Sequence, residues 1–350
     1  MLKILIKYFF KLFIKIIVIK LLNDYSNLLV YNIFIMKKIF LSVAAMMLLF
    51  SCQNDVTEME PETTAVLKRG CASSDVLAAQ IKADPSLALT MNKIENFTSN
   101  AMASGRLVNG KVEIPVVVNV LYRTASENIS DAQIQSQIDV LNADFNATNS
   151  DFSSTPALFS GVAANVGITF VLETINRKST TKTSWGTRDA MKKTKQGGID
   201  PTSPTNKLNM WSCTIGGGIL GYAQFPGGST TTDGVVMDSQ YFGLSGSAAF
   251  PYNLGRTGTH EVGHWMNLRH IWGDATCGSD IVSDTPSHNT ANYGVPAYPH
   301  YSTCTGTPVE MSMNYMDYTD DRGMYMFSNG QKSRMAAIFL SGGARAGFGI

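Results

Sequence analysis

The chain has 350 residues, of which 44% are hydrophobic and 16% charged, a composition too apolar for a disordered protein. Its net charge of +1 hides an uneven distribution, because residues 1–51 hold seven lysines and one acidic residue, Asp24. Residues 52–350 hold 21 basic and 26 acidic side chains, a net charge of −5. Residues 52–350, with this net negative charge, lack the basic surface that nucleic-acid binding needs, so we expect no nucleic-acid partner.

The first 51 residues predict an export signal behind an upstream extension. In residues 1–35, no uncharged apolar run reaches the roughly 18 residues of a membrane-spanning helix, and we interpret this stretch as lying upstream of the true start. Residues 36–51 join two lysines to an apolar run that ends in a small residue, as signal peptides do. Leu49-Phe50-Ser51-Cys52 resembles a bacterial lipobox. We therefore expect lipidation at Cys52, and an outer-membrane or cell-surface lipoprotein or a protein secreted after processing.

Two segments follow the export signal. Residues 52–105 begin as an acidic tether and continue with weak helical patterning at 76–81. In residues 106–350, the β-branched run 114–122 predicts a strand, and Ser130 with Gln133 predicts a capping box at the start of a helix over 131–145. Further strands are expected at 166–172, 208–213 and 234–237, a glycine-rich turn into another strand at 216–225, and a second helix from about residue 256. This order predicts an α/β domain with a twisted, mostly parallel sheet.

The cysteines separate into different expected roles. Cys277 and Cys304 flank a loop-rich stretch and form the expected disulfide, since an exported protein folds under oxidising conditions. Cys213 lies in a β-like run and is expected to be a buried thiol. Cys71 stands alone near the mature N-terminus, so it is either incidental or has a partner other than cysteine.

The second helix carries the chemistry. His260 and His264 are four residues apart, so on a helix both imidazoles project from one face and can hold one Zn²⁺. Glu261 adjoins the first ligand, where its carboxylate can take a proton from a water at the metal. The five-residue pattern HExxH also arises by chance in helices. A third histidine supports the zinc site.

That third histidine, His270, lies six residues beyond His264, a spacing that continuous helix would carry to another face. The chain must therefore break the helix between them. Asn267 lies in the middle of the gap, and asparagine is second only to glycine in tolerating the left-handed conformation that ends a helix.

With these residues, the stretch His260–His270 resembles the metzincin pattern, with Asn267 where that clan usually has glycine. The continuation Ile271-Trp272-Gly273-Asp274 resembles the pappalysin family of metallopeptidases, and residues 312–318 are similar to its Met-turn. The resemblance implies a metzincin-like catalytic domain with a twisted mixed sheet, an active-site helix and a C-terminal subdomain that carries the Met-turn. It further implies that Met316 lies beneath the zinc and that Tyr318 helps to bind the oxyanion.

Two features depart from the family pattern. Family members often carry a second cysteine pair around the positions of Val295 and Gly323, and both cysteines are absent here. Arg322 lies in a region that the family uses to shape the pocket for the residue after the scissile bond, so no relative's specificity can be borrowed. The strand around 221–225 resembles the edge strand along which such enzymes align an extended substrate.

A calcium site is also expected. Family members often bind calcium in the region where this chain has acidic and hydroxyl side chains, which are the ligands Ca²⁺ prefers; here they are Asp274, Asp280, Asp284 and Thr285. A solvated acidic loop is the alternative interpretation.

The function expected from these features is a secreted or surface-anchored zinc endopeptidase acting on protein or peptide substrates, with oligomeric state unspecified. A competing class is a surface-anchored binding lipoprotein with a non-catalytic metal, but a closed structural site would need four protein ligands and the motif offers three. A zinc amidase acting on cell-wall peptides is the alternative among enzymes.

Latency is the last expectation. A thiolate is a strong zinc ligand, so Cys71 could fill the open zinc position until residues 52–105 are removed. Arg69-Gly70-Cys71 resembles the cysteine-bearing propeptide motif of the family, with Ala72 where glycine is often found. The flexible, small-residue stretch before Arg106 is the expected cleavage region.

Overall fold

A computed structural model describes residues 68–104 and 112–348, all of which lie in one compact unit. The predicted extension, signal peptide and tether, including Cys52, lie outside the described residues, as do Gly105 and Arg106 of the expected cleavage region. Within the described ranges, no helix is both long enough and apolar enough to cross a membrane.

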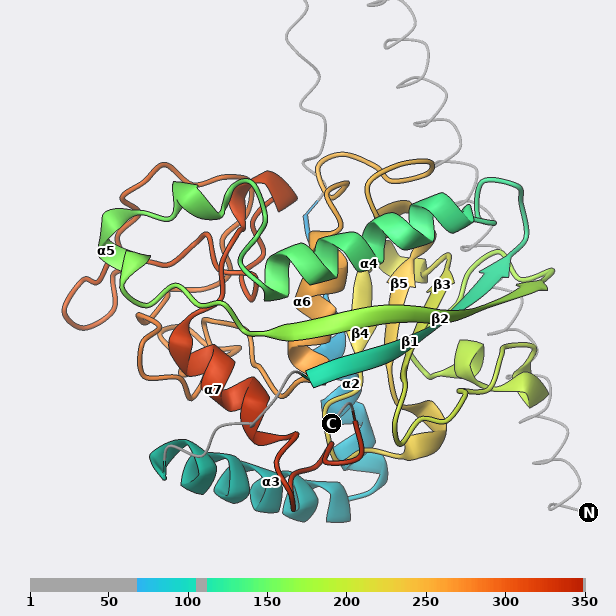
Figure 1. The fold of residues 1–350 in the computed structure, drawn as a ribbon, viewed down its shortest axis with the longest axis horizontal. Helices are drawn as coiled ribbons and strands as arrows, with labels where there is room; N and C mark the ends of the chain where they lie inside the picture. Colours follow the sequence, from blue (N-terminus) through green and yellow to red (C-terminus); the bar gives the residue numbers. More distant parts are fainter. Residues whose placement is uncertain (1–67, 105–111, 349–350) are drawn as a thin grey trace, which may run out of the picture. The chain divides into compact units, whose positions relative to one another are not determined.

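The domain is built on a five-stranded sheet of order β2-β1-β3-β5-β4 (Figure 1). The strands are β1 (Val112–Tyr122), β2 (Ile168–Ser179), β3 (Leu208–Cys213), β4 (Gly221–Ala223) and β5 (Val235–Asp238). Three of the four pairings are parallel, and only β4 runs antiparallel to its neighbour β5. The predicted mostly parallel sheet is confirmed, and its antiparallel member is the edge strand β4.

Six α-helices accompany the sheet in the described residues. They are α2 (Ser73–Ala83), α3 (Ser86–Ala103), α4 (Asp131–Phe145), α5 (Ala157–Ser160), α6 (Arg256–Trp265) and α7 (Asn329–Ala337). Short 3₁₀ turns lie at Phe152–Ser154, Ala190–Lys192, Thr194–Gln196, Gly216–Gly218, Thr230–Thr232, Ser239–Tyr241 and Asp321–Gly323. The helix predicted over 131–145 is α4, and the helix predicted from 256 is α6.

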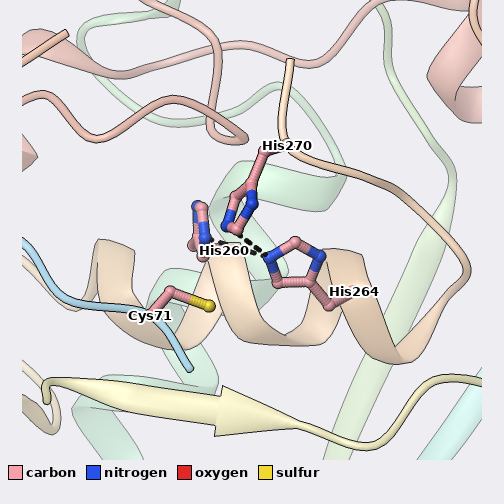
Figure 2. Close-up of side chains that lie close together, drawn as sticks. All are labelled: Cys71, His260, His264 and His270. Carbon is pink, nitrogen blue, oxygen red and sulfur yellow. Dashed lines mark hydrogen bonds between the residues drawn. The ribbon is translucent and has the colours of Figure 1, made fainter. Parts of the chain in front are cut away.

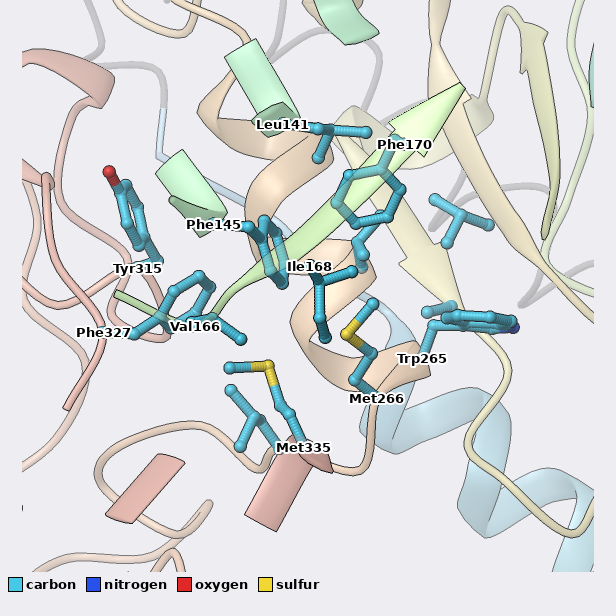
Figure 3. Packing of buried hydrophobic residues seen from close by; sticks show 14 of the residues in the cluster. Leu141, Phe145, Val166, Ile168, Phe170, Trp265, Met266, Tyr315, Phe327 and Met335 are labelled. Carbon is cyan, nitrogen blue, oxygen red and sulfur yellow. The ribbon is translucent and has the colours of Figure 1, made fainter. Parts of the chain in front are cut away.

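Alternating side chains of β1 divide the core into two layers, as strand geometry requires. Ile114, Val116, Val118 and Val120 face a large cluster that includes residues of α4, α6 and the C-terminal segment. Leu121 faces a second, smaller cluster on the opposite side of the sheet. Figure 3 shows how the first cluster interdigitates, with the Phe145 ring packed 5.1 Å from Phe170, centroid to centroid. This packing fixes α6 against the sheet.

One local prediction needs correction. The Ser130 hydroxyl caps α4 by accepting a hydrogen bond from the Gln133 amide, as expected. The Gln133 side chain, however, donates to the Phe242 carbonyl and to Ser247 instead of returning to the cap. A tertiary contact has replaced the second half of the capping box.

A complete capping box starts α7, a helix not expected from the sequence. The buried Ser328 hydroxyl accepts from the Gln331 amide at 3.1 Å and donates to Asp284 at 2.6 Å. We predict that Ser328→Ala lowers the free energy of unfolding by about 1–2 kcal/mol, because one capping bond and one bond to a carboxylate are lost together. Urea denaturation measures this change. Ser333→Ala on the same helix is the control, and an equal loss in both variants would refute the role of the cap.

Candidate metal centre

The helix α6 presents two of the expected ligands from a fully buried position. All ten of its residues are buried, and the Nε2 atoms of His260 and His264 are 3.2 Å apart. The helix lies against the sheet through Val262, so its ligand-bearing face is fixed in direction. The structure therefore brings together the two side chains that the four-residue spacing places on one face.

A backbone turn at Asn267 brings in the third histidine. Asn267 has φ of 74°, the left-handed conformation predicted for this position, and the Leu268 amide closes the turn by donating to the Gly263 carbonyl at 3.0 Å. The chain then reverses, and His270 Nε2 lies 3.1 Å from His264 Nε2. The helix break therefore converts a six-residue spacing into a shared site.

Each histidine is oriented by a hydrogen bond from its other ring nitrogen. The Nδ1 atom of His260 donates to the Tyr315 carbonyl at 2.7 Å, and that of His264 donates to the Leu268 carbonyl at 2.8 Å. The Nδ1 atom of His270 donates to the Asp274 carboxylate at 2.5 Å. These bonds leave the three Nε2 lone pairs free and facing one another. Partners of this kind are the usual supports of metal-binding histidines.

The three rings fit zinc. Burial, reinforced by the neighbouring histidines, lowers the pKa of His264 to about 3 and that of His260 well below its usual range, so both are neutral, as ligands must be. Tetrahedral zinc with Zn–N bonds near 2.0–2.1 Å would hold its nitrogens about 3.3 Å apart, close to the 3.1 and 3.2 Å separations found here. The separations of His264 from the other two rings therefore already suit the ion.

Glu261 lies beside this site and not in it. Burial raises the pKa of its carboxyl group to about 7, although hydrogen bonds from Ser73 and Cys71 and the charge of Arg69 oppose the shift. The facing residue of β4 is Gly221, where an added Cβ would lie 2.9 Å from the Glu261 side chain. Glycine at this position leaves the room that the carboxylate occupies.

Cys71 lies beside the three histidines. Its Sγ lies within 4.8 Å of a ring nitrogen of each of the three histidines, and Figure 2 shows the sulfur beside them. Backbone bonds hold the segment along β4: the Ala72 amide donates to the Gly221 carbonyl, and the Leu220 amide donates to the Gly70 carbonyl. The segment pairs with β4 in parallel at Cys71 and Gly221. The structure therefore brings the Cys71 thiol to the three histidines, and its role as a zinc ligand stays a prediction.

Two residues of the segment that resembles the Met-turn, Met316 and Tyr318, lie beside the site. An added Cβ on Gly263 would approach the Met316 sulfur to 2.5 Å, so the methionine side chain packs directly against the helix between two of the ligands. The Tyr318 hydroxyl donates to the Cys71 carbonyl at 3.1 Å. Burial, with the nearby Cys71 and Glu261, raises the pKa of Tyr318 well above its usual range, so the hydroxyl remains a donor.

A buried arginine pocket beside the site is a feature that the sequence analysis missed. The Arg69 guanidinium pairs with Asp321 at 2.5 Å, donates to Thr257 and to the Thr319 carbonyl, and lies 4.7 Å from the centre of the Tyr252 ring. Both charged side chains are almost fully buried. The signal was present, since Arg69 precedes Cys71 by two residues and Asp321 follows Tyr318 by three, but nothing in the sequence pairs them.

The cysteine predictions outside the site are confirmed. Cys277 and Cys304 form a disulfide, and Cys213 is a buried free thiol. The two positions that lack the family's second disulfide are neighbours, because an added Cβ on Gly323 would lie 3.1 Å from a Val295 methyl group. Val295 thus lies against Gly323, at the two positions where the family pattern implies a second disulfide. The side chain of Arg322 beside it is largely exposed.

The four residues expected to bind calcium do not converge on one point. Asp280 and Thr285 are in contact at 2.9 Å. Asp284 instead accepts from Ser328 and from the Gly330 amide at the start of α7, and Asp274 orients His270. Asp274 thus supports His270, and calcium binding by these residues stays a prediction.

Three buried histidines at a helix break, with a methionine turn beneath them and a mixed sheet behind, define a metallopeptidase of the metzincin type. Residues 212–340 match the model of a peptidase family whose description is pregnancy-associated plasma protein-A. Extracellular metalloprotease 1 of Coccidioides posadasii is 35% identical over 246 residues, covering 65% of this chain and 77% of the relative. An extracellular metalloprotease of Pyricularia oryzae is 33% identical over 257 residues, covering 69% and 80%.

Two solved structures extend the similarity. Mature mirolysin of Tannerella forsythia, in complex with a cleaved peptide, is 43% identical with a TM-score of 0.66, covering 68% of this chain and 96% of that chain. A promirolysin mutant of the same organism is 40% identical with a TM-score of 0.74, covering 80% and 96%. The chain belongs to the pappalysin family and is a zinc metalloendopeptidase. These matches lend no support to a non-catalytic binding lipoprotein or to a cell-wall amidase.

The Asn267 turn yields a test of the metal centre. We predict that Asn267→Gly keeps zinc, because glycine adopts φ of 74° without strain. Asn267→Ala should lower the free energy of unfolding by about 1–2 kcal/mol and weaken zinc retention, since the Cβ disfavours that conformation. Metal content after dialysis against a competing chelator distinguishes the two variants. Equal zinc loss in both would mean that the Asn267 side chain, and not its backbone conformation, maintains the turn.

Proposed function

We propose that the chain is an exported precursor of a zinc endopeptidase, with a signal peptide at 36–51, a tether and propeptide at 52–105 and a catalytic domain at 106–350. The observation that carries the proposal is the convergence of three histidine Nε2 atoms beside a buried carboxylate. The relatives named extracellular metalloproteases support export. Attachment through a lipid on Cys52 rests on the sequence motif alone.

In the proposed reaction, His260, His264 and His270 hold the zinc ion, which supplies a Lewis acid and lowers the pKa of water at the site. Glu261 accepts the proton of the attacking water and later passes it to the leaving amine. Tyr318 donates a hydrogen bond to the oxygen of the scissile carbonyl as negative charge develops there. The substrate pairs with the edge of β4, where Gly221 leaves Glu261 within reach.

Glu261→Ala tests the division of roles. Because the carboxylate is assigned as base and not as ligand, the variant should keep its zinc and lose at least about 99% of peptide hydrolysis. Metal analysis and a fluorogenic peptide assay on the processed protein measure the two properties separately. Zinc-loaded protein with undiminished hydrolysis would remove Glu261 from the mechanism.

Latency is proposed for the same site. The Cys71 thiolate would take the fourth zinc position, and the Ser73 hydroxyl donates a hydrogen bond to Glu261 at 2.9 Å. The segment would therefore block both the water position on the metal and the carboxylate of the base. The promirolysin mutant covers a larger share of this chain than mature mirolysin does. That difference supports an N-terminal propeptide here.

Cys71→Ala tests latency in the unprocessed chain. We expect the variant to hydrolyse peptide at once, or to process itself sooner than the unchanged chain, because water can then reach the zinc. A time course of peptide hydrolysis and of N-terminal processing, started at first purification, measures both. Equal lag and equal activity would show that the thiol does not hold the metal.

The pocket around Asp321 supports a preference for arginine next to the scissile bond. Arg69 fills it with its charge paired and its guanidinium stacked on Tyr252, and Tyr318 binds the carbonyl of Cys71 only two residues away. A substrate arginine directly after the scissile bond would make the same contacts once the propeptide leaves. Cleavage before Arg106, the position expected from the sequence, would follow the same rule.

Asp321→Asn tests this preference. The variant should lower kcat/KM for peptides with arginine after the scissile bond by about tenfold or more, because a buried ionic hydrogen bond is lost. Peptides with glutamine at that position should be affected much less. The measurement is the ratio of kcat/KM for the two peptides, and an unchanged ratio would place the arginine elsewhere.

A further inference from the structure

The helix α3 binds the catalytic domain through contacts other than those at the zinc ligands. Its Glu95 carboxylate forms a bidentate pair with Arg334 of α7, with distances of 2.7 and 2.5 Å. Arg334 is almost fully buried. Figure 1 shows α3 beside α7 and away from the strand β4. Cys71 pairs with that strand at Gly221. The propeptide is thus attached at two separate places.

The second attachment reaches the turn that positions His270. Arg334 Nε donates to the Asn267 carbonyl at 2.7 Å, so the same guanidinium joins Glu95 of α3 to the left-handed residue. Asn267 Nδ2 also approaches the Thr98 hydroxyl of α3 at 3.5 Å. The contact therefore involves polar groups that are buried at the back of the metal centre.

Apolar contacts accompany the ion pair. Ala101 of α3 packs with Ala337 and Leu340 in a small buried cluster, and Phe97 packs against it. The Phe97 ring also covers Gly342, where an added Cβ would lie 3.2 Å from a ring carbon. Glycine at this position leaves room for the aromatic ring beside the chain that follows α7.

Charge complements this packing. Burial disfavours ionisation of Glu95, yet the hydrogen bonds and charge of Arg334, with a contribution from Arg269, hold its pKa below the usual range. Both arginines belong to the catalytic domain, and loss of α3 would leave the buried guanidinium of Arg334 without the carboxylate that pairs with it. Separating such a buried pair is costly. The face formed by Arg334, Ala337, Leu340 and Gly342 therefore suits a helix that offers one carboxylate beside small and aromatic apolar side chains, as α3 does with Glu95.

We propose that this face retains the propeptide after the chain is cut, so that cleavage near residue 105 does not by itself release the inhibitor. The occupant is α3 of the same molecule, held through Glu95 independently of the Cys71–zinc contact. The cut segment then acts as a noncovalent inhibitor until it dissociates or is degraded. This inference rests on the proposed processing of residues 52–105.

The test separates binding from catalysis. In the full mature chain, residues 52–350, carrying Glu261→Gln, a recognition sequence for an unrelated site-specific protease is placed after Gly105 and cut. Size-exclusion chromatography and mass spectrometry then measure whether the fragment stays with the domain, and a fluorescent label on the fragment gives its dissociation rate. We expect the fragment to co-elute in this chain and in its Cys71→Ser variant.

Glu95→Gln should speed dissociation at least about tenfold, since a charged hydrogen-bond pair is broken. Asp75→Asn removes an exposed charge from α2 and is the matched control, which should leave the rate unchanged. Equal rates in the Glu95 and Asp75 variants, or loss of the fragment on Cys71→Ser alone, would overturn the proposal. This measurement requires no peptide hydrolysis. Failure of the proposed function would appear in a separate assay, in which the domain with intact Glu261, freed of the fragment, cleaves no peptide.

Discussion

The metal centre depends on the backbone conformation of one residue, Asn267. A straight continuation of α6 would carry His270 to another face, whereas φ of 74° reverses the chain and returns the ring to within 3.1 Å of His264. Two carbonyl groups around the turn have further roles, since Leu268 accepts from His264 and Asn267 accepts from Arg334. The turn therefore links the ligands, the C-terminal helix and, through Arg334, the propeptide.

The direction of the propeptide explains how a segment that resembles a substrate in its contacts can occupy the cleft as an inhibitor. It offers an arginine to the Asp321 pocket and a carbonyl to Tyr318, but its backbone runs parallel to β4. A strand that approached β4 antiparallel would present its peptide groups in the opposite order. Under the proposed mechanism, Cys71 takes the zinc position of the attacking water, and Ser73 hydrogen-bonds the Glu261 carboxylate that would accept its proton. No nucleophile is therefore available to attack the bound peptide group.

Local signals in the sequence predicted the parts of the structure that depend on neighbouring residues. The helix-spaced ligands, the break at Asn267, the cap at Ser130 and the strands 114–122 and 208–213 all follow from patterns a few residues long. The Arg69–Asp321 pair joins positions 252 residues apart, and the Glu95–Arg334 pair joins positions 239 apart. No periodicity encodes such contacts. Gln133 failed as half of a capping box for the same reason, because Phe242 and Ser247 compete for its side chain.

The contact between Gly263 and Met316 limits how this protein can diverge. In the pattern HExxH, the position of Gly263 is formally free, yet a methyl group there would meet the methionine sulfur at 2.5 Å. A larger residue at position 263 therefore requires a smaller or displaced side chain at position 316, more than fifty residues later. In this fold, fewer residue types can stand at position 263 than the pattern HExxH allows.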